Sequence, residues 1–119
     1  MENQLTPTEL ELMLILWSLN EASVKDIIAQ LPEDRKLAYT SVSTIIRILE
    51  KKGIVASKKN GRGHIYFPLV TKEDYEKSSV EHLVEKVFQG RSLALVKYLA
   101  EDKKLTKEQL LALEEILND

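Results

Sequence analysis

A change in hydrophobic periodicity at Gly53 limits what this chain can fold into. Before Gly53, apolar residues recur every three or four positions, as they do along amphipathic helices. After it, side chains alternate with period two on both sides of the turn Asn60-Gly61-Arg62-Gly63, and Asn-Gly in such a setting is a strong hairpin signal. We therefore predict several short helices followed by one hairpin with strands at residues 54–59 and 64–70.

Capping and stop signals predict where the first helices begin and end. Residues 6–9, Thr-Pro-Thr-Glu, combine a capping box with a proline suited to the first helical position, and they predict a helix over residues 7–19. A serine cap and a following proline bound a second helix over residues 24–31. A third helix is expected from about residue 39 to residue 52, with Gly53 after its end.

The third helix has two contrasting faces. Its apolar residues fall on one side at helical spacing: Val42, Ile45, Ile46 and Leu49. The other side is small, polar and basic: Thr40, Ser43, Thr44, Arg47 and Lys51. Two helices joined by a short turn and followed by a hairpin form a winged helix-turn-helix, whose last helix fits the wide major groove of DNA.

Basic charge is concentrated in the same region. The chain carries a net charge of −2, but between Arg35 and Arg62 there are eight basic side chains and one acid, Glu50, so this stretch carries a net +7. A local basic segment in an acidic protein is typical of DNA-binding proteins, although a solvated charged face is the ordinary alternative. Because this segment coincides with the third helix and the hairpin, DNA binding is the favoured reading.

We expect nine side chains to contact double-stranded DNA. They are Thr40, Ser41, Ser43, Thr44, Arg47, Lys51, Lys58, Lys59 and Arg62. The small residues at the start of the third helix are suited to base edges and thymine methyls, and the two basic residues that follow are suited to phosphates or a guanine edge. At the hairpin, the lysines are expected on phosphates and Arg62, in the glycine-rich turn, on the backbone or the minor groove.

The composition shifts after residue 70. Residues 71–74 predict a helix start, Gly90 interrupts the apolar stripe that follows, and Thr106 with Gln109 predicts a capped last helix. These helices carry more apolar surface than a small appendage can bury within itself, which favours association between copies. The predicted fold is mainly α with a small β-hairpin wing, divided into a DNA-binding domain (1–70) and a helical dimerisation arm (71–119).

Other classes of protein find little support in the sequence. The chain has no cysteine, no Ser/His/Asp set, no phosphate-binding glycine loop and no His and carboxylates at metal-ligand spacing, so we expect neither an enzyme nor a cofactor. No apolar run is long enough to span a membrane and no secretory signal is present, so a cytoplasmic location is expected. The main alternative is a winged-helix module that binds proteins rather than DNA.

The chain resembles the penicillinase repressor family of bacterial winged-helix repressors (the BlaI/MecI type) along essentially its whole length. The resemblance rests on residues 5–11 with Met13 and Trp17, on Tyr39-Thr40-Ser41-Val42-Ser43-Thr44, on residues 47–53 with their Lys-Lys-Gly ending, and on Gly61-Arg62 with Tyr66-Phe67-Pro68. It implies a cytoplasmic dimeric repressor of operator DNA with a helical C-terminal dimerisation domain. It also implies that Thr40, Ser41, Thr44 and Arg62 lie near DNA.

The chain departs from its relatives in the residues through which some of them are released from operator DNA. Some members of the family are inactivated when a membrane sensor protease triggers cleavage at an Asn-Phe step, and the matching step here is Lys97-Tyr98. Other relatives sense copper through C-terminal cysteines, which this chain lacks. The resemblance thus implies a sensor protease or another signalling partner without identifying the inducing signal.

Overall fold

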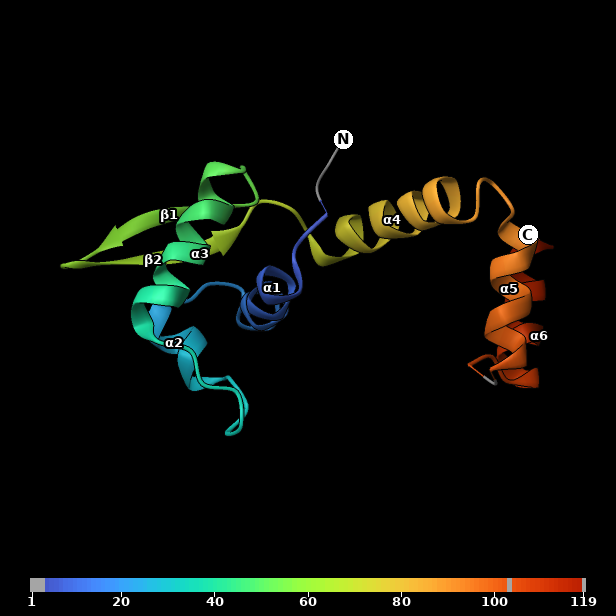
Figure 1. Ribbon diagram of the computed structural model, residues 1–119, viewed down its shortest axis with the longest axis horizontal. Helices are drawn as coiled ribbons and strands as arrows, with labels where there is room; N and C mark the ends of the chain where they lie inside the picture. Colours follow the sequence, from blue (N-terminus) through green and yellow to red (C-terminus); the bar gives the residue numbers. More distant parts are fainter. Residues whose placement is uncertain (1–3, 103, 119) are drawn as a thin grey trace. The chain divides into compact units, whose positions relative to one another are not determined.

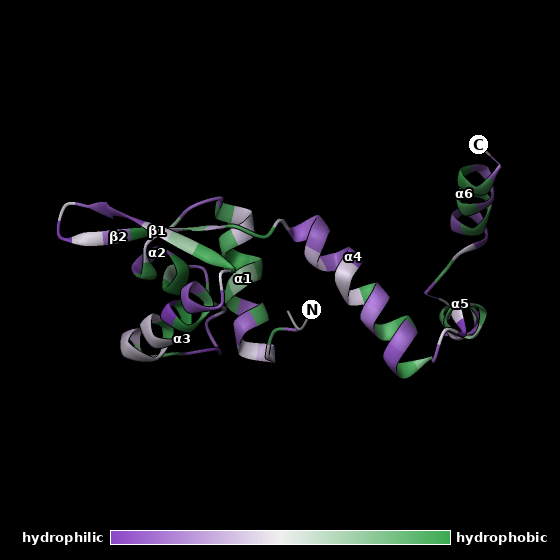
Figure 2. Ribbon diagram, turned by 90° about the horizontal axis from the view of Figure 1, so that it is seen from above, coloured by the Kyte–Doolittle hydropathy of each residue, from purple (hydrophilic) through white to green (hydrophobic). Residues whose placement is uncertain are grey.

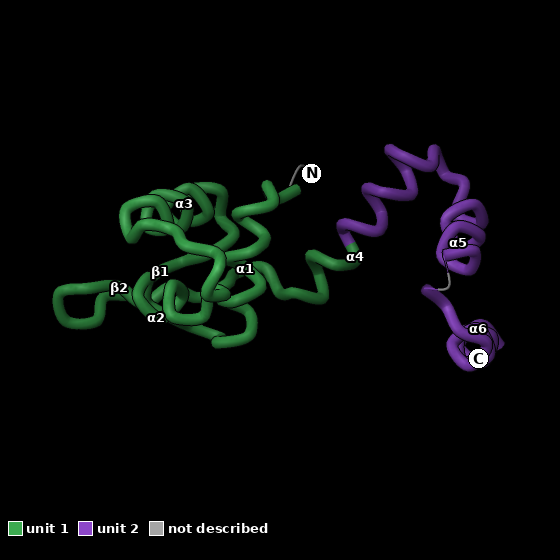
Figure 3. The backbone as a smooth tube through the Cα atoms, turned by 60° about the horizontal axis from the view of Figure 1, so that its bottom comes forward, with its two compact units in different colours: residues 1–77 green, residues 78–119 purple. Residues whose placement is uncertain are grey.

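A computed structural model describes residues 4–102 and 104–118 of the protein. The chain divides into two compact units, Met1–Lys77 and Ser78–Asp119, which are described separately (Figure 3). The two units are defined by the contacts within each of them. The predicted DNA-binding domain (1–70) and dimerisation arm (71–119) are defined by function instead. The functional boundary at residue 70 therefore stays a prediction.

The first unit is a winged helix, as the sequence predicts. Its elements are, in chain order, α1 (Pro7–Leu19), α2 (Val24–Ala29), α3 (Tyr39–Lys51), β1 (Val55–Asn60) and β2 (Gly63–Pro68), as drawn in Figure 1. The helix α2 ends earlier than predicted. The amides of Gln30 and Leu31 bond to carbonyls three residues back, at Ile27 and Ile28, so the last turn tightens before Pro32 is reached.

Both predicted N-terminal caps of this unit form. At α1, the Glu9 amide donates to Thr6 Oγ1 over 3.2 Å while the Thr6 amide donates to Glu9 Oε1 over 2.9 Å. The same reciprocal pair joins Ser23 and Asp26 at the start of α2. Each cap satisfies backbone donors that the first helical turn would otherwise leave without partners.

One apolar core holds the three helices against the hairpin. Its buried side chains are Leu12, Met13, Leu16, Ala22, Val24, Ile27, Val42, Ile46, Leu49, Ile54, Val55 and Tyr66. Trp17 lies at the edge of this core, and its Nε1 donates to the Val70 carbonyl over 2.8 Å. This bond and the contact between the Trp17 and Tyr75 rings attach the segment after β2 to α1.

The wing turns within the predicted segment 60–63, and each strand extends one residue further into this segment than predicted. Asn60 pairs with Gly63, so the two loop residues are Gly61 and Arg62. Gly61 has φ +63°, which fits a glycine at the first loop position of a type II′ hairpin turn. The edge of β2 that does not face β1 pairs with Ala22, through two backbone hydrogen bonds between Ala22 and Tyr66. Sequence patterning did not reveal this bridge.

Helix α4 (Lys72–His82) runs from the first unit into the second. There it continues as a π-helical turn, η1 (Leu83–Val87), followed by α5 (Ser92–Glu101) and α6 (Lys107–Leu117). The predicted interruption lies at Gly90, with φ +85°, and the predicted cap between Thr106 and Gln109 forms. None of the described helices is both long and apolar enough to cross a membrane.

Candidate nucleic-acid interface

The packing of α3 exposes one face of the helix. Val42, Ile46 and Leu49 are buried in the core, so the residues on the other side are turned to solvent. We call this surface the α3 face; its exposed residues are Thr40, Ser41, Thr44, Arg47, Ile48 and Lys51. Five of them are predicted site residues, and they belong to one helical surface as expected.

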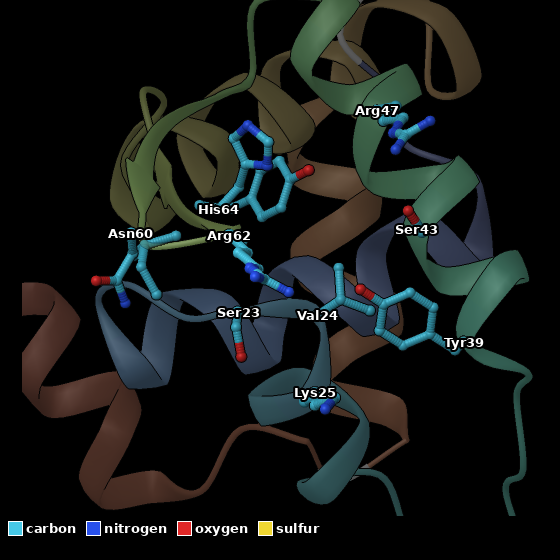
Figure 4. Close-up of a pocket in the computed structure, with 12 residues that line it drawn as sticks. Ser23, Val24, Lys25, Tyr39, Ser43, Arg47, Asn60, Arg62 and His64 are labelled. Carbon is cyan, nitrogen blue, oxygen red and sulfur yellow. The ribbon is translucent and has the colours of Figure 1, made fainter.

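A cleft of about 510 Å³ lies between α3, the start of α2 and the wing (Figure 4). We call it the wing cleft; it is lined by Ser23, Val24, Lys25, Tyr39, Ser43, Arg47, Asn60, Arg62, Gly63, His64, Ile65 and Tyr66. The predicted site residue Ser43 is half-buried here rather than on the α3 face. Arg47 from α3 and Arg62 from the wing contribute positive charge to different walls of the cleft.

Ion pairs neutralise part of the basic stretch. Lys58 Nζ lies 3.0 Å from a carboxylate oxygen of Glu21, and Lys52 Nζ lies 2.9 Å from one of Glu9. Arg35 Nε lies 3.0 Å from a carboxylate oxygen of Glu11. Within the described residues, the bases of this stretch that have no acidic partner are Lys36, Arg47, Lys51, Lys59 and Arg62. The positive charge available to a ligand is therefore concentrated on the α3 face and the wing.

The two adjacent lysines of β1 do not share a surface. Successive side chains of a strand point to opposite faces of a sheet, so Lys58 and Lys59 lie on different sides of the wing. Lys59 is opposite His64, which lines the wing cleft, whereas Lys58 pairs with Glu21. Both were predicted to bind phosphate, and the geometry is more favourable for Lys59.

Ile48 was not among the predicted site residues, although it belongs to the α3 face. Its side chain is 42 % exposed, whereas Ile46 of the same helix is fully buried in the core. A signal was present in the sequence, because Ile48 is four residues after Thr44 and therefore on the polar side of the helix. An open hollow of about 390 Å³ on the same helix is lined by Thr40, Ser41, Thr44 and Ile45.

Glu9 fixes the end of α3 nearest the wing. Its carboxylate is nearly buried and accepts hydrogen bonds from Lys52 Nζ and from the Thr6 amide. Burial alone would raise the pKa of the Glu9 carboxyl, but the bonds from Thr6 and Lys52 outweigh it and hold the pKa below its ordinary value of 4.5. The carboxylate stays charged at neutral pH and joins the start of α1 to the residue that caps α3.

In residues 4–102 and 104–118, no three His, Cys, Asp or Glu side chains are grouped so that they could hold a metal ion. What the first unit does offer is an exposed helix face with polar and basic side chains, beside a cleft with an arginine on two of its walls. This fold and surface define a winged-helix protein of the DNA-binding class.

Comparison with known proteins places the chain within this class. The family model described as "Penicillinase repressor" matches residues 5–119, so the chain belongs to the penicillinase repressor family. The family resemblance read from the sequence is thereby confirmed.

Two curated relatives illustrate the similarity. The methicillin resistance regulatory protein MecI of Mammaliicoccus sciuri is 29 % identical, over 97 % of this chain and 94 % of its own length. The penicillinase repressor of Bacillus licheniformis is 24 % identical, over 98 % of this chain and 91 % of its own length. In both cases the alignment includes the second unit as well as the winged helix.

Two solved structures resemble the winged helix. The DNA-binding domain of the repressor BlaI aligns with a TM-score of 0.54 at 28 % identity, covering 60 % of this chain and 88 % of that chain. The monomeric form of Bacillus licheniformis BlaI, in complex with the blaP half-operator, aligns with a TM-score of 0.51 at the same identity and coverage. The predicted fold class and repressor family thus agree with the structural comparison.

Proposed function

We propose that this protein binds an inverted-repeat operator as a homodimer and represses transcription by occluding the promoter. The observation that carries the proposal is the α3 face, a solvent-exposed surface of polar side chains that also includes the basic Arg47 and Lys51. The half-operator complex of the relative BlaI supports duplex DNA as the ligand. The function belongs in the cytoplasm, where bacterial DNA is found.

In this proposal the α3 face enters the major groove and the wing cleft lies against the phosphate backbone. Thr40, Ser41 and Thr44 lie in the N-terminal half of α3, the part of a recognition helix that usually meets base edges. Arg47 and Arg62, on separate walls of the cleft, are suited to phosphates at its rim. Because phosphate contacts displace counterions, binding should weaken steeply as salt increases.

Dimerisation is assigned to the second unit. Its helices expose large apolar side chains: Val80, Val87, Leu93, Tyr98, Leu99, Leu110, Leu111, Leu113, Ile116 and Leu117. One winged helix covers only a few base pairs, so specific binding generally uses two copies on half-sites about one helical turn, or a multiple of it, apart. Pairing of the second units would supply the two copies and cover the apolar surface.

Release from DNA is proposed to act through this same unit. The step Lys97-Tyr98, which the family resemblance matches to the cleavage step of some relatives, is exposed on α5. A sensor protease or another signalling partner that cuts or distorts the pairing helices would separate the two DNA-binding units. Each unit alone would then hold the operator weakly.

Selection of bound sequences from a random duplex pool tests the proposal. We expect purified full-length protein at moderate salt to enrich an inverted repeat whose half-site centres are about 34–36 Å apart, or a multiple of that spacing. Enrichment of nothing, at salt low enough for nonspecific binding to be visible, would contradict the proposal. That outcome would favour the alternative of a winged-helix module that binds another protein.

A further inference from the structure

The α3 face combines polar side chains with one large apolar side chain, Ile48. Contact with an apolar group of the ligand would remove this side chain from water, which is favourable. Arg47 and Lys51, its neighbours on the helix, are basic and have no acidic partner within the described residues. A protein partner with an apolar surface would have to bury these charges, whereas DNA would neutralise them.

Thr44 presents a methyl group to the same surface. Its Oγ1 donates to the Thr40 carbonyl over 2.8 Å, so the only hydroxyl hydrogen of Thr44 is already used within the helix. The hydroxyl therefore cannot also donate to a base. The Cβ atom of threonine carries one hydroxyl and one methyl. Because the hydroxyl of Thr44 bonds to the helix backbone, the methyl is the group that can contact the ligand.

Thr44 and Ile48 form a short apolar strip along α3. They are one helical turn apart, a rise of about 6 Å, which is close to the spacing of two base-pair steps. Beside the strip lies the hollow lined by Thr40, Ser41, Thr44 and Ile45, which leaves room for a group that projects from the groove floor. The strip offers apolar contact and no hydrogen-bond donor.

In the major groove, thymine alone of the four bases presents a methyl group, at C5. We propose that Thr44 and Ile48 select thymine in each operator half-site by packing against these C5-methyl groups. This inference rests on the proposed DNA-binding function and adds the chemistry by which part of the sequence is selected. It also makes Ile48 a specificity-determining residue.

Replacement of thymine by deoxyuridine tests this, because it removes the methyl and keeps base pairing. The probe is the operator duplex enriched in the selection, with each thymine replaced in turn, and binding is measured by fluorescence anisotropy with full-length protein. We expect one or two positions per half-site at which the replacement weakens binding about fourfold per methyl. At those positions the penalty should disappear in Ile48→Ala or in Thr44→Ser, which removes only the methyl.

Two control variants make the result specific. Thr44→Val keeps a methyl and loses the hydroxyl, so it should retain the penalty. Leu14→Ala removes an apolar side chain of similar exposure on α1 and should change neither affinity nor the response to deoxyuridine. Thermal unfolding of each variant verifies the fold, since these exposed positions should change stability by about 0.5 kcal/mol or less.

The inference is overturned if the enriched duplex binds equally well with deoxyuridine at every thymine. It is also overturned if the penalty is the same size in Ile48→Ala and Thr44→Ser as in the parent protein. In both cases the operator is still bound, so the proposed function stands. If no duplex is enriched at all, the proposed function fails and the inference fails with it.

Discussion

Glu9 joins two helices that are far apart in the sequence. Its carboxylate meets Lys52, 43 positions later, and completes the capping box of α1 with Thr6. The side chain of Lys52 is 43 % exposed, so solvent weakens this ion pair, while the carboxylate itself is nearly buried. The Glu9 side chain thus both caps the start of α1 and attaches the C-terminal end of α3 to it.

Glu9→Gln should lower the free energy of unfolding by about 1 kcal/mol at neutral pH, because glutamine keeps the capping acceptor but loses the charge. The pKa of Glu9 is lowered in the folded state, so its contribution is fully present above about pH 4.5 and is lost as the pH falls through the folded pKa. The difference between parent and variant should shrink over that range. Urea unfolding at fixed protein concentration, from about pH 7 to about pH 3, measures this.

Glu11→Gln serves as the matched control. Glu11 also pairs with a basic side chain, Arg35, but both side chains are more exposed than that of Glu9. Its loss should cost about 0.5 kcal/mol or less. Equal stability of parent and Glu9→Gln at neutral pH would show that the pair with Lys52 contributes nothing.

The exposure and pairing of single residues were predictable only where they depend on local spacing. The polar side of α3 follows from its helical period, so the exposure of Thr40, Thr44 and Arg47 was foreseeable. The pairing of Lys58 with Glu21 was not, because it depends on how the wing packs beside the turn after α1. A count of charges cannot show which of them are already neutralised in the fold.

At the scale of elements, the geometry of the wing depends on Gly61. Its φ of +63° is a conformation that side chains with a Cβ rarely adopt, and nothing lies within 4 Å of an added Cβ. Gly61→Ala should therefore destabilise the wing by about 1–2 kcal/mol through backbone strain alone. Thermal unfolding should show the loss, and operator affinity should fall because Arg62 is the next residue in the turn.

Gly63→Ala is the control in the same turn. Gly63 does not have a positive φ, and an added Cβ would meet the Asn60 carbonyl oxygen at 3.9 Å, an ordinary contact. Little change in stability is expected. If the two substitutions cost the same, conformational strain at Gly61 is not the cause.

Element starts were more predictable than ends. The caps at Thr6, Ser23 and Thr106 use side chains three residues apart, which a sequence displays directly. The hairpin register was predicted correctly, but the strand ends were not: β2 was expected to run to residue 70 and ends at Pro68. The bridge between Ala22 and Tyr66 depends on how α1 and α2 pack against the wing, which no local pattern encodes.

At the scale of the whole molecule, the two units differ in how they are stabilised. The first has a core of fully buried side chains, whereas α5 and α6 contain no buried residue. Figure 2 shows apolar residues along α5 and α6, and Leu117 is 75 % exposed. These helices need a further apolar surface, which the proposed homodimer supplies.

If the proposed homodimer pairs through α6, the double substitution Leu113→Glu/Leu117→Glu should convert it to single chains by placing charges in the pairing surface. Sedimentation should report the mass of one chain. Affinity for the inverted repeat should fall about a hundredfold or more, whereas affinity for one half-site should change little. Glu115→Gln, on the opposite side of α6, should leave both properties intact, and a monomeric parent protein would refute the assignment.

The described helices of the second unit contain no buried side chain, and this has a consequence for how operator occupancy depends on the amount of protein. If its helices are completed only by another copy, their folding is a bimolecular event whose yield depends on how many chains a cell contains. Operator occupancy then rises more steeply than in proportion to the concentration of the chain. A modest dilution of the protein, such as rapid growth produces, lowers operator occupancy more than in proportion. A cell could therefore induce the controlled genes through abundance, by slower synthesis or faster turnover of the chain, without any inducer binding to it.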